Sequence, residues 1–259
     1  MSGTAAGARI DLNADLGEAN GGVLVADDEA MIALISSANI ACGFHSGDAR
    51  TMRAATSAAA RRGVAVGAHV AYRDQAGFGR RFIDYDPEEL ADEVLYQIGA
   101  LDAIARSQGT RVGYVKPHGA LYNAIVKNRE QARAVVAGVR AFSDLPIVLL
   151  PGGVAIEEAE NAGLTVVREA FADRGYTPEG TLVPRGKPGD LLDGADAVTE
   201  RVLGLASSGT VTAVDGSVVD VAADSICVHG DSPDSVAMTE AIVKALDEAG
   251  VELRPAVGA

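Results

Sequence analysis

Tryptophan is absent from this chain of 259 residues, and aromatic residues make up only 4% of it. Hydrophobic residues nevertheless reach 48% of the sequence, so a core must be built from Ala, Val, Ile and Leu. Residues of this kind line parallel sheets that carry helices on both faces. The composition therefore favours an α/β fold over a β-sandwich.

Basic residues are also scarce, since 22 Lys and Arg stand against 36 Asp and Glu, for a net charge of -14. A surface of this sign repels nucleic acid and anionic membranes, so neither is an expected partner. No apolar run approaches the roughly 20 residues that span a bilayer, and the first residues lack a leader pattern. We therefore expect a soluble, cytoplasmic protein.

Only two cysteines are present, Cys42 and Cys227, which fits a reducing compartment. Each lies in an apolar run just before a histidine, a position typical of a small buried hydrophobic residue. A catalytic thiol is the alternative, and it requires a lowered pKa that the sequence does not reveal.

The chain does contain a regular alternation of short β-type runs and longer helical patterns, typical of βα units around a parallel sheet. The pattern predicts strands near residues 8–12, 38–42, 64–68, 111–116, 146–150, 164–168 and 225–229. It predicts helices near residues 27–37, 48–62, 86–108, 128–142, 153–162, 188–207 and 232–249. We therefore expect one domain, residues 1–259, folded as a seven-stranded parallel β/α barrel of the TIM type.

One segment, residues 210–222, breaks this alternation. In it, β-branched residues flank Asp215-Gly216, a dipeptide typical of two-residue hairpin turns. We expect a β-hairpin inserted before the last strand.

All four histidines fall at the same kind of place, the downstream end of a predicted strand: His45, His69, His118 and His229. The active site of a βα barrel lies at this end of its strands, and histidine titrates near neutrality and often binds metals. The pattern predicts one site assembled from distant loops. The simpler interpretation is that each histidine only forms hydrogen bonds at a strand terminus.

Acidic residues accompany the first strand. Strand alternation places Asp11, Asn13 and Asp15 on one side of it, and Glu18 follows in the next loop. Acids beside histidines orient an imidazole, share a metal ion with it, or divide acid and base roles. For Asp15 alone, the competing interpretation is a residue that caps or turns the loop.

Further charged residues follow two other strands. Lys116 and His118 stand at the end of the fourth strand, and a lysine in a barrel mouth binds a carboxylate or stabilises a developing oxyanion. Glu169, Asp173 and Arg174 follow the sixth strand. Arg174 is expected either to clamp a substrate carboxylate with two donors or to form an ordinary ion pair.

Motifs that would identify a nucleotide site or a nucleophile are missing. Residues 180–188 differ from a phosphate-binding loop in their glycine spacing and in having Pro188 where Ser or Thr binds Mg²⁺. The sequence also has no G-x-S-x-G elbow, no G-x-G-x-x-G fingerprint and no H-x-x-x-H pair. A metal site therefore requires that the fold bring separate histidines together.

Several long blocks of the sequence are distinctive: DLNADLGE from residue 11, NIACGFHSGD from 39, GAH from 67, GFGRR from 77, VKPHGALYN from 115, FADRGY from 171, LVPR from 182 and ICVHGD from 226. In this order, and over nearly the whole chain, they resemble the LamB/YcsF family, whose members are described as the A subunit of bacterial 5-oxoprolinase. One departure follows His69, where VAYRD replaces the family's PSYPD, so two prolines and a serine are missing.

The resemblance implies a distorted β/α barrel similar to those of sugar deacetylases. It also implies a hydrolase acting on a cyclic amide, which opens 5-oxo-L-proline to L-glutamate with consumption of ATP and release of ADP and phosphate. Two partner subunits, B and C, would take part. Whether a divalent metal is also needed stays open.

The absence of a nucleotide loop suggests that partners contribute to activation while this barrel directs water at the activated carbon. The expected catalytic residues are Asp11, Asp15, His45, His69, Lys116 and His118. One of these histidines would act as general base, an acid of the first strand would orient it, and the lysine would stabilise negative charge. The expected substrate-binding residues are Asn13, Glu18, Glu169, Asp173, Arg174 and His229.

Two other functions stay open at this point. The first is a stand-alone metal-dependent deacetylase or amidohydrolase, in which the metal activates water. The second is a non-catalytic subunit that binds substrate for its partners.

Overall fold

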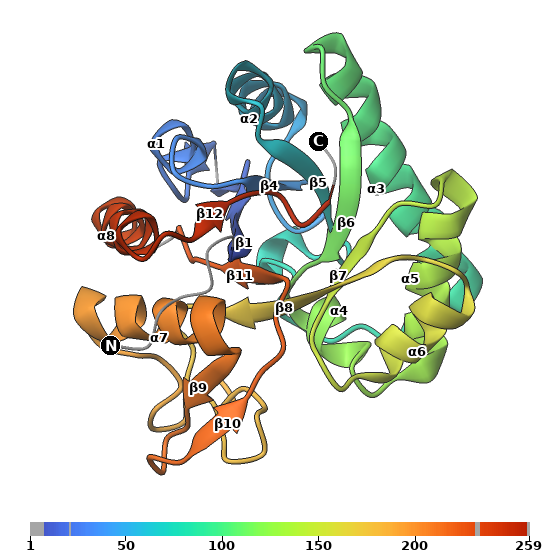
Figure 1. Cartoon of the computed structure of the whole chain (residues 1–259). Coiled ribbons are helices and arrows are strands. Elements are labelled where there is room, and N and C mark those ends of the chain that lie inside the picture. Colours follow the sequence, from blue (N-terminus) through green and yellow to red (C-terminus); the bar gives the residue numbers. More distant parts are fainter. Residues whose placement is uncertain (1–7, 21, 231–233, 258–259) are drawn as a thin grey trace.

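The computed structural model describes residues 8–20, 22–230 and 234–257. Its centre is a closed barrel of seven parallel strands in chain order, in which the last strand pairs with the first (Figure 1). The strands are β1 (Arg9–Leu16), β4 (Ser37–Ala41), β5 (Ala65–Val70), β6 (Val112–Pro117), β7 (Ile147–Leu149), β8 (Val166–Phe171) and β11 (Ser225–Cys227). The expected seven-stranded α/β barrel is confirmed.

Helices surround this barrel on the outside (Figure 1). They are α1 (Asp28–Ile32), α2 (Ala49–Arg62), α3 (Pro87–Ser107), α4 (Gly119–Ala124), α5 (Arg129–Phe142), α6 (Val154–Asn161), α7 (Ala195–Ser208) and α8 (Ser235–Glu248). Asp48 caps α2 and Asp86 caps α3, each by accepting hydrogen bonds from backbone N–H groups of the first turn. These caps fix where the helices begin, because the first amides of a helix have no partner within it.

Short elements complete the described chain: β2 (Ala19–Asn20), β3 (Val23–Leu24), a 3₁₀ turn (Gln75–Gly77), β9 (Thr210–Thr212), β10 (Val218–Asp220) and β12 (Glu252–Leu253). β9 and β10 are antiparallel, so the hairpin expected at 210–222 is confirmed. Its connection covers residues 213–217 rather than two residues, since Thr212 pairs with Val218. Asp215 stabilises this longer turn by accepting a hydrogen bond from the backbone N–H of Ser217.

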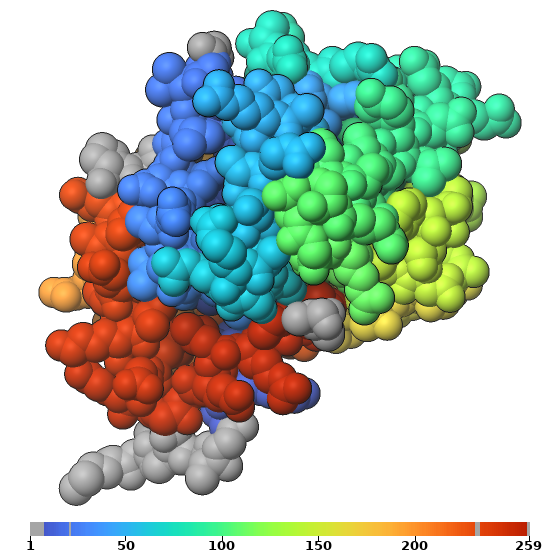
Figure 2. Space-filling model, turned by 90° about the horizontal axis from the view of Figure 1, so that it is seen from above, coloured from blue at the N-terminus to red at the C-terminus, as the bar shows by residue number. Residues whose placement is uncertain are grey.

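The first and last strands of the described chain lie side by side. β12 pairs in parallel with Arg9 and Ile10 at the start of β1. In Figure 2 the blue surface of the first elements adjoins the red surface of the last ones. The later half of β1 pairs instead with β4, so the barrel encloses the part of β1 that carries Asn13 and Asp15.

Two helices are shorter than the sequence indicated. The helix expected at 188–207 begins only with α7, because Gly189 and Gly194 adopt φ angles of 80° and 87°, which a helix does not allow. The helix expected at 27–37 ends at Ile32, since the chain must turn there to enter β4. In both cases a local apolar pattern extended beyond the helix itself.

Other boundaries moved by a few residues. The strand expected at 164–168 lies later, as β8, so Glu169 is inside the strand rather than after it. The strand expected at 225–229 ends at Cys227. For the helix expected at 232–249, residues 232 and 233 lie outside the described chain, and α8 covers most of the remainder.

The main hydrophobic core lies between the strands and the surrounding helices. Along β1, Leu12, Ala14 and Leu16 are fully buried and belong to this core. Asn13 and Asp15 alternate with them and point into the barrel, as the sequence pattern predicted. Within the described ranges, no helix combines the length and the apolar character needed to cross a membrane.

Candidate active site

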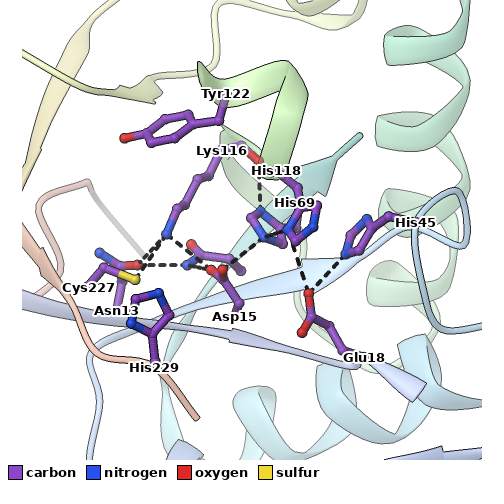
Figure 3. Close-up of polar contacts among 12 residues, drawn as sticks. Asn13, Asp15, Glu18, His45, His69, Lys116, His118, Tyr122, Cys227 and His229 are labelled. Carbon is purple, nitrogen blue, oxygen red and sulfur yellow. Dashed lines mark hydrogen bonds and ion pairs between the residues drawn. The ribbon is translucent and has the colours of Figure 1, made fainter. Parts of the chain in front are cut away.

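Three histidines meet at the mouth of the barrel, where β4, β5 and β6 end (Figure 3). His69 Nε2 lies 2.9 Å from His118 Nδ1, and the rings of His45 and His118 stack with their centroids 3.8 Å apart. Backbone carbonyls hold two of these rings, since the oxygen of Lys116 is 3.0 Å from His69 Nδ1 and that of Phe78 is 3.0 Å from His118 Nε2. The structure thus brings together three of the four expected histidines.

Two carboxylates from the end of β1 and the loop after it face these rings. Asp15 Oδ2 lies 3.1 Å from His69 Nε2, and Glu18 Oε1 lies 3.0 Å from His45 Nε2. Burial raises the pKa of Glu18, and the charge of Asp15 raises it further. Burial also disfavours ionisation of Asp15, but His69 and Lys116 outweigh it, so the pKa of Asp15 lies well below its usual range. The two acids therefore differ in proton affinity, and Asp15 is the one held ionised.

Lys116 lies at the centre of the polar network inside the barrel. Its Nζ is 2.8 Å from Glu169 Oε1, 3.1 Å from Asp15 Oδ1 and 3.1 Å from Asn13 Oδ1. Burial by itself lowers the pKa of this amine, but the charges of Asp15 and Glu169 raise the pKa well above its ordinary value. The site therefore contains a buried ammonium group between two carboxylates.

Neutral side chains complete this network. Asn13 Nδ2 donates to Glu169 Oε1 at 3.1 Å, and the hydroxyl of Tyr122 donates to Glu169 Oε2 at 2.6 Å. Asn39 Nδ2 donates to Asn13 Oδ1 at 2.7 Å. Sequence reasoning missed Asn39 and Tyr122. The signal for Asn39 was available, because it is a polar residue on the inner side of a strand whose neighbours are apolar.

Asp11 lies deeper in the barrel than the histidines. Its carboxylate accepts hydrogen bonds from the hydroxyl groups of Ser36, Ser37 and Ser225 at 2.5, 2.7 and 2.6 Å. Asp11 precedes Asp15 by four residues on an extended strand, so the Cα atoms of the two residues are about 13 Å apart. The contact with a histidine that was expected of Asp11 or Asp15 is therefore made by Asp15.

The fourth histidine lies apart from the other three. His229 follows β11, and its Nδ1 is 2.7 Å from Asp173 Oδ2. Arg174 donates to the backbone oxygens of Asp190 and Val183 at 3.0 and 2.6 Å. Arg174 thus uses two donors, as expected, but they bind the protein's own backbone rather than a free carboxylate. These hydrogen bonds stabilise the loop after β8.

Both cysteines are buried and unpaired. Burial raises the pKa of the Cys42 thiol to about 12. Burial also raises the pKa of Cys227, although Lys116 Nζ lies 3.2 Å from its sulfur and opposes the effect. Because the thiolate is the reactive form, these raised pKa values support the interpretation of both cysteines as small buried residues.

The loop after β5 covers the histidine cluster. An ion pair between Asp74 and Arg81 joins two parts of this loop. Between them, Gly79 adopts a φ angle of 64°, and a Cβ atom built on it would lie 2.7 Å from His45 Cβ and 2.8 Å from His118 Cδ2. Glycine therefore lets the backbone approach both rings more closely than any other residue allows.

We expect Gly79→Ala to destabilise the protein more than a matched change at Gly163. Both glycines have positive φ angles, 64° and 77°, but a Cβ on Gly163 meets nothing within 4 Å. Gly163→Ala therefore reports backbone strain alone, about 1 kcal/mol, whereas Gly79→Ala adds the steric clash for a total of about 2–3 kcal/mol. Urea unfolding measures both values, and equal losses would contradict the close approach to the rings.

Asp28, the first residue of α1, supports the turn that carries Glu18. Its Oδ2 accepts a hydrogen bond from the backbone N–H of Gly17 at 2.9 Å. Burial raises the pKa of Asp28 to about 6. The folded state therefore binds a proton here more tightly than the unfolded chain does, where an aspartate has a pKa of about 3.9.

Asp28→Asn should remove this pH dependence of stability. Because the pKa of Asp28 is raised in the folded state, its contribution to the free energy of unfolding is complete below about pH 4. This contribution is lost as the pH rises through 6, a change of about 3 kcal/mol in the free energy of unfolding. Asn keeps an acceptor for Gly17 but does not ionise. The free energy of unfolding is measured for the variant and the unsubstituted chain from pH 4 to pH 7.5. The difference, variant minus unsubstituted chain, should increase as the pH rises. A constant difference across this range would show that Asp28 does not titrate as described.

Residues 10–259 match the model of the LamB/YcsF family. The chain belongs to this family. A relative from Corynebacterium jeikeium (strain K411), named as the A subunit of 5-oxoprolinase, is 58% identical over 254 residues, which cover 98% of each chain. Another with that name, from Kocuria rhizophila, is 58% identical over 95% of this chain and 98% of its own. The crystal structure of the lactam utilization protein from Thermus thermophilus superposes with a TM-score of 0.91 at 45% identity, covering 95% of this chain and 99% of that one.

Membership of the LamB/YcsF family confirms the resemblance found in the sequence. The blocks that carried it also supply the barrel mouth: His45 belongs to NIACGFHSGD, His69 to GAH, and Lys116 and His118 to VKPHGALYN. The superposition on the Thermus structure confirms the barrel over 95% of the chain. Several of the distinctive residues of this LamB/YcsF protein therefore lie in the buried polar network at its mouth.

Proposed function

We propose that this chain is one subunit of an ATP-dependent 5-oxoprolinase, which opens 5-oxo-L-proline to L-glutamate and releases ADP and phosphate. The observation that carries the proposal is the 58% identity, over 98% of both chains, to a protein named as the A subunit of 5-oxoprolinase. A name of this kind implies further subunits. Two partners, B and C, complete the proposed enzyme.

The chemistry of the substrate explains why ATP and partners are included. A five-membered lactam is a poor electrophile, and glutamate tends to recyclise, so ring opening must be coupled to a reaction that supplies free energy. Phosphorylation of the lactam oxygen by ATP supplies it. Because this sequence has no phosphate-binding loop, the partners are proposed to contribute to activation. This barrel then holds the ring and directs water at the activated carbon.

The histidine cluster is the proposed base. Burial lowers the pKa values of His45 and His118 well below the ordinary histidine value, so both rings are neutral near pH 7 and are able to accept a proton. Asp15 is ionised and 3.1 Å from His69 Nε2, a position that suits it to orient that ring. General base catalysis of this kind contributes about 10²–10⁴-fold to a rate.

Lys116 is the proposed partner of the negative charge that develops on oxygen. Its ammonium group is buried with Asp15 and Glu169, away from bulk water, where a fixed charge acts more strongly than at the surface. Asn13 and Glu169 contact Lys116 directly and are proposed to bind the substrate beside it. Glu18, Asp173 and His229 are proposed to contact the substrate elsewhere in the mouth. Arg174, whose Nε and Nη2 donate to backbone oxygens, is left out of this set.

A stand-alone metal-dependent amidohydrolase or deacetylase is the second candidate. One observation favours it: Glu18, His45, His69 and His118 each offer a ligand atom, and these atoms lie within 4.8 Å of one another. A purely substrate-binding role is less favoured, because binding alone does not require neutral histidines beside an ionised acid and a buried lysine.

Glutamate release from 5-oxoproline separates these candidates. The chain alone should release no glutamate, with or without ATP, whereas the chain mixed with both partner subunits and ATP should release it steadily. Release by the chain alone without ATP would contradict the proposal and favour the amidohydrolase. The Lys116→Met variant of the chain, tested in both arms, controls for contaminating activity.

A further inference from the structure

Four buried residues at the barrel mouth converge on one small volume (Figure 3). They are Glu18, His45, His69 and His118, and one ligand atom from each lies within 4.8 Å of the other three. All four are less than a tenth exposed. They come from β1, β4, β5 and β6 or the loops directly after these strands, so the barrel itself holds them together.

The hydrogen bonds of two rings determine where their protons lie. His69 Nδ1 is bonded to the backbone oxygen of Lys116, and His118 Nε2 to that of Phe78. A carbonyl oxygen only accepts, so both of these nitrogens carry hydrogen. In neutral rings the other two nitrogens, His69 Nε2 and His118 Nδ1, then present lone pairs, and they lie 2.9 Å apart. Two lone pairs at this distance repel each other unless a positive charge lies between them.

Acceptor atoms also surround this pair of nitrogens. Asp15 Oδ2 is 3.1 Å from His69 Nε2, and Glu18 Oε1 is 3.7 Å from His118 Nδ1. On the other side, His45 Nε2 is 3.0 Å from the same Glu18 oxygen. His45 Nδ1 is buried and has no hydrogen-bond partner in the part of the chain that the structure describes. The cluster is thus rich in electron-pair donors and poor in protons to share among them.

We propose that Glu18, His45, His69 and His118 bind a divalent transition-metal ion. Three imidazoles and one carboxylate form a donor set that suits Zn²⁺ and its neighbours Fe²⁺, Co²⁺ and Ni²⁺ rather than Mg²⁺ or Ca²⁺. The backbone carbonyls that bind the outer nitrogens of His69 and His118 act as supports, because they fix the tautomers that point lone pairs inward. Asp15 Oδ2 lies 3.1 Å from His69 Nε2, so it would support that ligand from the side.

This inference concerns what the cluster holds and does not depend on 5-oxoproline being the substrate. If 5-oxoproline is the substrate, an ion held by these four residues would lower the pKa of the attacking water, and it would do so in place of a free imidazole acting as base. In the absence of an ion, a proton between His69 Nε2 and His118 Nδ1 is the other occupant that relieves the lone-pair repulsion. Metal binding, measured without any activity assay, distinguishes the two.

The test uses the whole chain, expressed without a polyhistidine tag. After removal of metal by a chelator, titration with Zn²⁺ should show one ion bound per chain and raise the melting temperature, and Co²⁺ should give the visible absorption of a nitrogen- and oxygen-ligated ion. His69→Ala and Glu18→Gln should each weaken Co²⁺ binding by tenfold or more. His229→Ala is the matched control, because this histidine pairs with Asp173 outside the cluster, and it should bind as the unsubstituted chain does.

Three results would overturn the proposal. The first is failure of the intact chain to bind Zn²⁺, Co²⁺, Fe²⁺ or Ni²⁺ at micromolar concentration. The second is unchanged Co²⁺ binding by the Glu18→Gln and His69→Ala variants, which would place the ion elsewhere. The third is ¹⁵N NMR of the imidazoles showing that His69 Nε2 keeps a proton in the presence of metal, which would identify the shared proton as the occupant.

Discussion

Lys116→Met should lower glutamate formation by the complete enzyme about 10²–10³-fold through kcat. This is the effect expected when one donor that stabilises a developing oxyanion is removed. Met has nearly the length of Lys and fills the same space without charge. Lys127→Met is the matched control, since that lysine is exposed on the surface, and it should retain the full rate. Initial rates at saturating 5-oxoproline and ATP measure both, and equal rates for the two variants would show that the buried ammonium is not used.

The same substitution should destabilise the chain. Lys116 lies between Asp15 and Glu169, and removal of one partner of a buried ion pair leaves the other unpaired, at a cost of about 3–5 kcal/mol. Urea unfolding of Lys116→Met therefore accompanies the kinetic assay. To separate folding from chemistry, the assay is run at a temperature where circular dichroism shows the variant to be folded. A folded variant that keeps the full rate contradicts the proposed role.

His118→Ala should lower kcat of the complete enzyme about 10²–10⁴-fold, the range for loss of a general base or of the water-activating group it belongs to. Its ring contacts His69 at 2.9 Å and stacks on His45 at 3.8 Å, so its removal disrupts the whole cluster. His229→Ala provides the contrast. His229 pairs with Asp173 apart from the cluster, so its loss should raise KM more than it lowers kcat.

Measured kcat and KM for both histidine variants, with 5-oxoproline varied at saturating ATP, check this contrast. If His118→Ala changed KM alone, the ring would bind substrate rather than assist the chemistry. If His229→Ala reduced kcat as severely as His118→Ala, the division of the mouth into two groups of histidines would be wrong.

The parts of the site that follow from strand geometry could be predicted from the sequence. Alternation along β1 correctly placed Asn13 and Asp15 inside the barrel, because successive side chains of a strand point to opposite faces. The position of histidines at strand ends also predicted that His45, His69 and His118 meet, since parallel strands all end at one mouth. These features depend only on the period of the strand and on the order of the elements.

The remaining features depend on tertiary contacts that no local pattern encodes. His229 shares its place at a strand end with the other histidines, yet the side of the barrel on which β11 lies directs it to Asp173. Asp11 has the same alternation as Asp15 but lies deeper, among serines. The backbone oxygen of Phe78, which fixes the tautomer of His118, belongs to a loop whose path depends on Gly79.

The central claim is that this chain is essential for the ring opening of 5-oxoproline by the assembled enzyme. Glutamate and phosphate are measured side by side in a mixture of ATP, 5-oxoproline and the two partner subunits, with this chain present or omitted. The account predicts glutamate formation only when the chain is present, with phosphate released in step. Glutamate formation at the same rate by the partner subunits without this chain would contradict it.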